Sequence, residues 1–435
     1  MRESQVMENK EGLKNMVSSR NLHTLSENFE PATKLYQKKI QQGAVKNLQP
    51  KCANCSSKHV FQTLLNTPKA ILVDIVPHRT DMDDAKANLD ELNSLVNTLG
   101  GITIKKVIQK RGRPSAKTFL GSGKTQEVAE FIKILHTNVV IFNNILKPNQ
   151  VLHLTAILKT KVWDRVDLIL KIFEKHATTR ESKLQINLAK LYHEFPKLYG
   201  KGYAIGEYGK GVAFSQQTGG GAGKTGVRGP GEKYLEQRKR HLRRQIKISE
   251  DQLEVIKRQR KSQREVRKRK NLKTITIVGY TNSGKSTLLK ALTNKKEVYI
   301  ADELFATLDT KIGDMYLQQY GTVLVADTIG FIKDLPPFLI KSFLATLEEV
   351  KEADLILHVI DISDPRVLEK IEVVEKILEE LECGDKPRIN VLNKIDEIHR
   401  KRFRKLPGNS IAISALKKQG VGDLIKKIKN YLRKM

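Results

Sequence analysis

The stretch TITIVGYTNSGKSTLLKAL, residues 274–292, joins a β-branched apolar run to a glycine loop and then to a helical pattern. Gly279 and Gly284, followed by Lys285 and Ser286, match the phosphate-binding loop G-x-x-x-x-G-K-S, with a strand before it and a helix after it. Glycines let backbone N–H groups turn inward around phosphates, and the helix points the positive end of its dipole at the same anion. The segment therefore predicts an α/β domain that binds a nucleotide.

Two hydroxyls near this loop are predicted to hold a metal ion. Lys285 is expected to reach the β- and γ-phosphates, and Ser286 is expected to ligate Mg²⁺, a hard cation that prefers oxygen. The motif FATLD, Phe305–Asp309, lies between the helix of the loop and the next strand pattern. Within it, Thr307 is the best candidate for a second Mg²⁺ ligand.

The motif DTIG ends another apolar run and predicts a switch. Asp327 can hold a Mg²⁺-bound water, and the Gly330 N–H can bond to a γ-phosphate, a contact that exists only with a triphosphate. Phe331 stands where Ras-like enzymes carry a glutamine that orients the attacking water. Phe331 therefore predicts slow intrinsic hydrolysis, with the water positioned by another group or by a partner. A compatible alternative is that Phe331 packs under the switch.

The motif NKID, Asn393–Asp396, selects the base. Asp396 can accept hydrogen bonds from the N1–H and 2-amino groups of guanine, whereas adenine would present an unpaired acceptor, a mismatch that costs about 1–3 kcal/mol when buried. Asn393 can bond near N7, the Lys394 stem can lie over the ring, and the Ala415 N–H can meet O6. The order of these motifs along the chain is the order that a GTPase needs.

The expected nucleotide-binding residues fall into five groups. They are Gly279, Tyr280, Thr281, Asn282, Ser283, Gly284, Lys285 and Ser286; Phe305, Ala306, Thr307, Leu308 and Asp309; Asp327, Thr328, Ile329 and Gly330; Asn393, Lys394, Ile395 and Asp396; and Ser414, Ala415 and Leu416. Lys285, Thr307 and Gly330 are the expected catalytic residues. Ser286 and Thr307 are the expected Mg²⁺ ligands, with GTP or GDP as the bound nucleotide.

The chain is strongly basic. It has 78 Lys and Arg against 48 Asp and Glu, a formal net charge of +30. A soluble protein with this balance most often meets a polyanion, commonly nucleic acid, and lysine enrichment from a biased genome is the alternative. No apolar run reaches the roughly 18 residues that a membrane helix needs. Three cysteines indicate a reducing compartment rather than a disulfide scaffold.

Composition divides the chain into five segments. Residues 1–67 are polar and basic, and we expect a variable, disordered extension, with an organelle-targeting segment as the alternative. Strand and helix patterns alternate over residues 68–198, which predicts a βαβ domain. Residues 199–231 are glycine-rich and predict a flexible loop. Residues 232–270 predict a basic helical linker, as a hairpin or a coiled pair. Residues 271–435 predict a Ras-like, doubly wound and mostly parallel sheet with one antiparallel strand.

Two further Gly-Lys-Thr runs resemble the phosphate loop only in part. FLGSGKT at 119–125 and GGGAGKTG at 219–226 lack the first glycine, with Thr118 and Thr218 in its place. We interpret the first as a turn that enters a helix and the second as part of the loop. A second nucleotide site at either place is the alternative.

The quoted motifs resemble one family, the HflX-type GTPases of the translation-factor-like branch. GYTNSGKSTL, FATLD, DTIGFI followed by DLP, NKID and SAL are similar to the signatures of its G domain. GPGEKYLEQRKR resembles its glycine-rich loop running into a long helix, and GSGK together with KVWDRVDLILKIFEKHATTRESKLQINLAKL resembles its N-terminal domain. The resemblance covers about residues 68–435 and leaves out residues 1–67.

This resemblance implies an N-terminal α/β domain, a helical linker, a C-terminal G domain and binding to the ribosome. The expected partner is the large subunit and its rRNA, with splitting or recycling of ribosomes as the expected role. The alternative is a guanine-nucleotide-gated RNA-binding protein with negligible turnover. We expect a monomer without stable membrane association, located in the cytoplasm or, alternatively, in the mitochondrial matrix. The basic runs Arg238–Arg244, Arg258–Lys270 and Arg111–Lys124 are expected to contact RNA.

Overall fold

The computed structural model describes residues 68–209, 230–293, 304–305, 311–318, 321–397 and 408–433. The chain divides into two units, residues 1–67 and residues 68–435, and only the second contains described residues. The extension predicted for residues 1–67, the centre of the glycine-rich loop and the predicted site residues Ala306–Asp309 lie outside the described residues. None of the helices in the described ranges has the length and apolar character to cross a membrane.

The first sheet of the second unit is parallel throughout. Its strands lie in the order β2-β1-β3-β4, so the chain reverses its direction of winding between β1 and β3. The elements are β1 (Lys69–Val76), α5 (Met82–Leu99), β2 (Ile102–Lys110), α6 (Ser122–Leu135), β3 (Val139–Phe142), α7 (Pro148–Leu158) and β4 (Lys161–Asp164). Strands β1 and β3 are almost wholly buried, as their mostly apolar sequences require for a sheet covered on both faces, and β1 buries one charged side chain, Asp74.

The partial phosphate-loop match at residues 119–125 forms a helix entry. Helix α6 begins at Ser122 with Gly121 in extended geometry at its N-cap, and the Thr125 hydroxyl donates back to the Gly121 carbonyl at 2.9 Å. No strand leads directly into this turn, because β2 ends at Lys110 and a short β-bridge between Ser115 and Phe119 intervenes. This agrees with the interpretation of the run as a turn.

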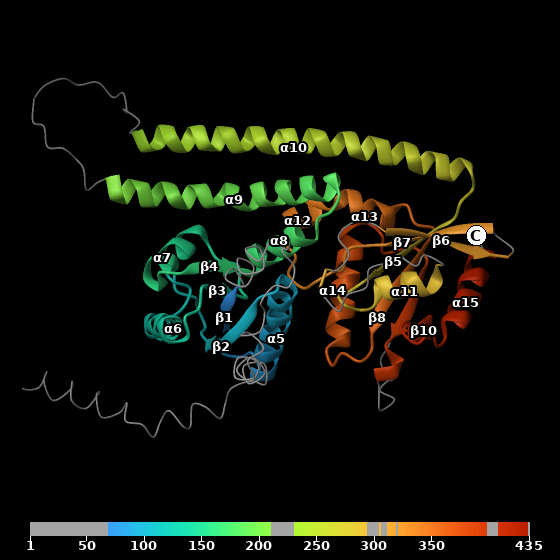
Figure 1. Cartoon of the computed structure of the whole chain (residues 1–435), viewed down its shortest axis with the longest axis horizontal. Helices are drawn as coiled ribbons and strands as arrows, with labels where there is room; N and C mark the ends of the chain where they lie inside the picture. Colours follow the sequence, from blue (N-terminus) through green and yellow to red (C-terminus); the bar gives the residue numbers. More distant parts are fainter. Residues whose placement is uncertain are drawn as a thin grey trace, which may run out of the picture. The chain divides into compact units, whose positions relative to one another are not determined.

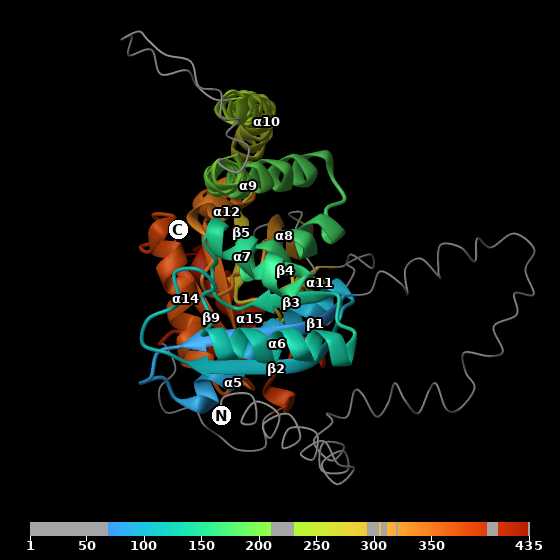
Figure 2. The same cartoon turned by 90° about the vertical axis from the view of Figure 1, so that its left-hand side faces the viewer.

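Two long helices follow the first sheet and α8 (Arg165–His176). Helix α9 (Arg180–Gly209) and helix α10 (Pro230–Arg269) lie side by side (Figures 1 and 2). The helical linker is thus one continuous helix paired with α9, and not a hairpin within residues 232–270. Both ends of the segment predicted as a flexible loop are also helical, since α9 continues to Gly209 and α10 begins at Pro230. Leu191, Leu198 and Leu242 bury the contact between the two helices.

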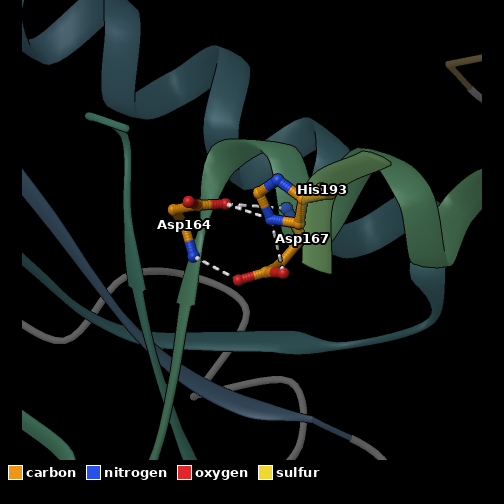
Figure 3. Close-up of side chains that lie close together, drawn as sticks. All are labelled: Asp164, Asp167 and His193. Atoms are coloured by element: carbon orange, nitrogen blue, oxygen red, sulfur yellow. Dashed lines mark hydrogen bonds and ion pairs between the residues drawn. The ribbon is translucent and has the colours of Figure 1, made fainter. Parts of the chain in front are cut away.

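A buried polar cluster ties α8 to α9. Asp164 caps α8 by accepting the Asp167 N–H at 2.8 Å, and His193 of α9 lies 3.0 Å from the Asp167 carboxylate (Figure 3). Lys197 also donates to Asp167 at 2.9 Å. Burial opposes ionisation of Asp167, but the His193 hydrogen bond and the Lys197 charge outweigh it and hold its pKa below the usual range. We assign no metal here, because His193 and Lys197 already occupy the Asp167 oxygen that a cation would need.

The second sheet has the order β10-β9-β8-β5-β7-β6, with β6 antiparallel to β7 and all other pairs parallel. This confirms the predicted fold class and the antiparallel edge strand. Its elements are β5 (Thr274–Gly279), α11 (Lys285–Leu292), β6 (Lys311–Leu317), β7 (Gly321–Asp327), α12 (Pro337–Ser342), α13 (Leu344–Lys351), β8 (Leu355–Asp361), α14 (Val367–Glu380), β9 (Arg388–Asn393), a 3₁₀ turn η2 (Ile395–Glu397), β10 (Ser410–Ala412) and α15 (Val421–Arg433).

Apolar packing joins the helices beside the first sheet to the second sheet's domain. Phe173 of α8 makes edge-to-face contacts with Phe305, at 4.7 Å between ring centroids, and with Phe343, at 5.0 Å. Such aromatic pairs add about 0.5–1.5 kcal/mol each beyond the area that they bury. The first residue of the motif FATLD is therefore packed into the core shared by both domains.

Candidate functional site

The phosphate-loop motif forms the turn between β5 and α11. Gly284 is the N-cap of α11 at φ 92°, and a Cβ on it would stand 2.2 Å from the Asn393 side-chain nitrogen. Only glycine fits this left-handed and crowded position. Asn393 Nδ2 also donates to the Ser283 carbonyl at 2.9 Å, so the base-reading motif is directly bonded to the phosphate loop.

Lys285 lies inside the turn with little exposure to solvent. Its Nζ donates to the Tyr280 carbonyl at 2.8 Å, which holds the amine at the centre of the loop. Burial lowers the pKa of Lys285 to about 8, against the opposing effect of the Asp327 charge. A partly desolvated amine at this position favours an anionic partner.

The two groups expected at the metal ion meet at the end of β7. Ser286 Oγ donates to Asp327 Oδ2 at 2.6 Å. Both are hard oxygen donors, and Asp327 is fully buried, so the donor chemistry fits Mg²⁺. The remaining predicted metal ligand, Thr307, lies outside the described residues.

Two buried hydroxyls in the loop also fit a bound ligand. Thr281 Oγ1 and Ser283 Oγ have no hydrogen-bond partner within the described ranges. Both side chains are almost wholly buried. Because an unpaired buried hydroxyl is costly, these two groups are suited to a polar ligand seated in the loop.

The segment that follows DTIG is docked on the loop. The Phe331 N–H donates to the Gly279 carbonyl at 3.1 Å, and the Thr281 N–H donates to the Phe331 carbonyl at 2.7 Å. A Cβ on Gly330 would lie 2.8 Å from the Thr281 side chain and 3.0 Å from Lys285 Nζ, so glycine is required for this close approach. The Phe331 ring is buried in the core, where it cannot reach a water in the site.

The base-reading residues lie together at the ends of β9 and β10. Asn393 Oδ1 accepts the Ala415 N–H at 2.9 Å, so guanine O6 would have to replace that bond to use the same N–H. The Ser414 hydrogen bond keeps the pKa of Asp396 below its usual value, so this carboxylate is an ionised acceptor. Lys394 Nζ pairs with Asp361 Oδ2 at 2.8 Å.

The structure adds residues that the sequence motifs did not indicate. Asp361 at the end of β8 orients Lys394, and it also accepts from the Ser363 N–H and hydroxyl. Glu91 of α5 accepts the Tyr280 hydroxyl from the loop. No local pattern could have identified Glu91, since it stands in an ordinary amphipathic helix far from the loop in sequence.

Comparison with known proteins matches three family models along the chain. Their descriptions are GTP-binding GTPase N-terminal over residues 86–174, GTP-binding GTPase Middle Region over residues 176–267, and 50S ribosome-binding GTPase over residues 274–394. A GTPase HflX from Caldanaerobacter subterraneus subsp. tengcongensis is 41% identical over 369 residues, which cover 84% of this chain and 81% of that protein. The chain belongs to the HflX family of GTPases.

The Escherichia coli GTPase HflX is 40% identical over 329 residues, covering 75% of this chain and 73% of that protein. Among solved structures, a GTP-binding protein from the archaeon Sulfolobus solfataricus in complex with GDP has 25% identity and a TM-score of 0.42, covering 84% of this chain and 99% of that one. The assignment to the HflX family rests on the sequence matches.

Three arginines of the basic run Arg258–Lys270 in this HflX-family chain pair with acidic residues of the chain itself, and the other basic residues of the run are exposed. Arg264 pairs with Glu348 at 2.7 Å and Arg267 with Glu349 at 3.5 Å, both on α13. Arg260 pairs with Glu181 of α9 at 2.7 Å. The acidic face of α13 and the start of α9 therefore partly neutralise these three arginines, and RNA contact by the run Arg258–Lys270 stays a prediction. Most of the Arg238–Arg244 run is exposed.

Proposed function

We propose that this chain binds GTP together with Mg²⁺ and hydrolyses it as a switch that acts on the ribosome. The single observation that carries the proposal is the direct bonding of the phosphate loop to the base-reading motif. Asn393 donates to Ser283, so the phosphate end and the guanine end of one site are held at a fixed separation. Family membership supports GTP as the nucleotide.

The side chains of the site have distinct tasks in this proposal. Lys285 exchanges its bond to the Tyr280 carbonyl for the β- and γ-phosphates, and Ser286 and Asp327 hold Mg²⁺ directly or through water. Mg²⁺ when bound neutralises charge that develops on the phosphates. Gly330 undocks from Thr281 and offers its N–H to the γ-phosphate. Thr307 is the proposed second metal ligand.

Phe331 does not position the attacking water. The Phe331 ring is 1% exposed and its backbone pairs with the loop. Intrinsic turnover is therefore expected to be slow. Charge supplied in trans raises such rates by about 10³–10⁵ in other GTPases, and we propose that the ribosome provides it.

The proposed partner is the large ribosomal subunit, contacted through its rRNA. The matched description 50S ribosome-binding GTPase supports this, as does the exposed basic run Arg238–Arg244 on α10. Phosphate contacts of this kind weaken steeply with salt, with a log–log slope of about 0.7–0.9 for each neutralised charge. We propose that the chain acts as a monomer on cytoplasmic ribosomes, with the mitochondrial matrix as the alternative compartment, and that it splits or recycles them.

Two measurements test the proposal. Sedimentation with purified ribosomal subunits is expected to show more bound protein with a non-hydrolysable GTP analogue than with GDP. Multiple-turnover GTP hydrolysis is expected to rise at least tenfold when large subunits are added. Nucleotide-dependent binding without any rise in turnover would favour the guanine-nucleotide-gated RNA-binding protein instead. No nucleotide-dependent binding would refute the ribosomal role.

A further inference from the structure

A closed hydrogen-bond network links helix α5 to the phosphate loop and to the segment after DTIG. The Tyr280 hydroxyl donates to Glu91 Oε1 at 2.7 Å and accepts the Lys333 N–H at 3.0 Å. Arg165 Nη2 donates to the same Glu91 oxygen at 3.1 Å and to the Lys333 carbonyl at 3.4 Å. The N–H and the carbonyl of Lys333 are therefore both held by side chains that bond to the same Glu91 oxygen.

The network is buried, and its one carboxylate, Glu91, faces two cations, Arg165 at 3.1 Å and Arg366 at 3.9 Å. The side chains of Arg165 and Glu91 are 5% and 9% exposed, and Tyr280 is 7% exposed. Arg165 Nη1 also donates to Asn143 at 2.8 Å, so the guanidinium is anchored in the first sheet's domain. Charge-assisted hydrogen bonds are stronger than neutral ones, and a low-dielectric setting strengthens them further.

The tyrosine keeps its proton in this setting. Burial, followed by the Glu91 charge and hydrogen bond, raises the pKa of Tyr280 far above its ordinary value. The phenol is therefore a permanent donor toward Glu91 and leaves its lone pairs for the Lys333 N–H. Lys370 lies over the Tyr280 ring at 4.9 Å from its centroid, which holds the ring in place from its face.

We propose that Glu91 is a positioning residue for the nucleotide site. It fixes the Tyr280 hydroxyl and the Arg165 guanidinium, and these hold Lys333 so that the segment after DTIG stays docked on the loop. Docking keeps the Thr281 N–H on the Phe331 carbonyl and Gly330 against Lys285. In the proposed site, a γ-phosphate would lie between Gly330 and Lys285 and separate them, whereas a diphosphate would leave Gly330 docked. The network therefore lowers the affinity for GTP relative to GDP.

This inference rests on the proposed GTP site. Contact between the first sheet's domain and the loop sets the preference between di- and triphosphate. A partner that moves α5 away from Tyr280 would free Lys333 and favour the triphosphate-bound arrangement. The network borders a cavity of about 510 Å³ between α5 and the loop, lined by Glu91, Tyr280, Asn282 and Arg366 among others.

The test uses substitutions that delete single hydrogen bonds. Tyr280→Phe removes the hydroxyl and keeps the ring, and Glu91→Gln removes the charge at nearly constant shape. Affinities for GDP and for β,γ-imido-GTP are measured by calorimetry on the full chain, with thermal melting to verify folding. Each variant is expected to tighten the analogue about five- to tenfold relative to GDP, as expected for the loss of one or two hydrogen bonds.

Tyr192→Phe is the matched control, because the Tyr192 hydroxyl also bonds to a carboxylate, Glu250, but in the contact between α9 and α10. Its nucleotide preference is expected to equal that of the wild type. The double variant Tyr280→Phe with Glu91→Gln is expected to change the preference no more than the larger single effect, because both act through one network.

A nucleotide preference within twofold of wild type in both folded single variants would overturn the inference. Fully additive effects in the double variant would also overturn it. If the wild type bound neither nucleotide, the proposed function itself would be refuted and this inference with it. Wild-type binding with unchanged variants refutes the positioning role alone.

Discussion

The Asn393 side chain bonds to Ser283 and Ala415 at once, with Nδ2 on the Ser283 carbonyl and Oδ1 on the Ala415 N–H, both at 2.9 Å. Asn393 is 3% exposed, so neither bond is easily replaced by water. One side chain therefore fixes the phosphate loop and the loop after β10 relative to the base-reading motif. This makes Asn393 a structural support as well as a candidate contact to the purine.

Replacing Asn393 with Ala is expected to weaken GDP binding at least tenfold and to lower the free energy of unfolding by about 1–3 kcal/mol, because two buried backbone groups lose their partners. Calorimetric titration and urea unfolding measure the two effects. Asn390→Ala is the control on the same strand. Its side chain donates to the Gly408 carbonyl, so stability should fall while GDP affinity stays within twofold. Equal loss of affinity in both variants would contradict the role given to Asn393.

The buried Lys285 gives the nucleotide-free protein a specific dependence on pH. Burial lowers the pKa of Lys285 to about 8 in the folded protein, against about 10.5 in the unfolded chain, so the unfolded chain binds more protons between these pH values. Stability contributed by Lys285 therefore rises with pH from about 8 to 10.5, by up to about 3 kcal/mol. Lys285→Met should remove this rise. The measurement is the difference in urea unfolding free energy between wild type and variant at pH 7.5, 9 and 10, and a constant difference would contradict the burial effect.

The affinity for nucleotide is expected to fall as the pH rises above about 8. Lys285 loses its charge in this range, and a neutral amine attracts phosphates less. Lys285→Ala is expected to abolish measurable binding of GDP and GTP at pH 7. Lys290→Ala, on the same helix and exposed, is the control and should bind as the wild type does. Normal GTP affinity in Lys285→Ala would count decisively against the site.

Mg²⁺ should contribute to binding through Ser286 and Asp327. Chelation with EDTA is expected to reduce the affinity of the wild type for β,γ-imido-GTP by at least about tenfold, since Ser286 and Asp327 would hold an ion that offsets the phosphate charge. Ser286→Ala should have reduced affinity with Mg²⁺ and little further loss with EDTA. Ser342→Ala, whose hydroxyl bonds to the Phe338 carbonyl, is the control and should keep the full EDTA effect. An unchanged EDTA effect in Ser286→Ala would exclude this residue as a ligand.

Two arginines in the C-terminal half of α10 are expected to contribute differently to stability. Arg264→Ala should destabilise the fold by about 1–3 kcal/mol, because Glu348 and Glu349 each lose one cation and keep only Lys257 and Arg267. Exposed Arg258, paired with Glu254 one turn away, should cost under about 1 kcal/mol when replaced by Ala. Thermal melting compares the two variants.

RNA binding is expected to depend on the N-terminal half of α10 and not on Arg264. Arg243→Ala with Arg244→Ala is expected to reduce the salt slope of rRNA binding by about one for each phosphate contact that is lost. Arg264→Ala should leave that slope unchanged at a temperature where the variant is folded. A lower slope in Arg264→Ala would mean that the C-terminal half of α10 also contacts RNA.

Much of the fold could be predicted from local sequence. The strand patterns TITIVG and TVLVAD form β5 and β7, and the pattern around Gly321 gives the antiparallel edge, because buried strands need continuous apolar runs and tight turns need glycine. The limits of the glycine-rich segment were predicted less well. Helix α9 continues through Gly202 and Gly206 despite the low helix propensity of glycine, so the glycine content of this segment did not mark the end of the helix.

The sequence alone determined the order and spacing of the phosphate loop, DTIG and NKID, because each motif is contiguous and its chemistry depends on neighbouring residues. Only the tertiary structure decided which distant groups meet them. Glu91 and Tyr280 are separated by 189 positions and still share a hydrogen bond, and Arg264 points its charge at α13 rather than at solvent. Such contacts depend on how whole elements pack, and no pattern within a single helix encodes the partner across the interface.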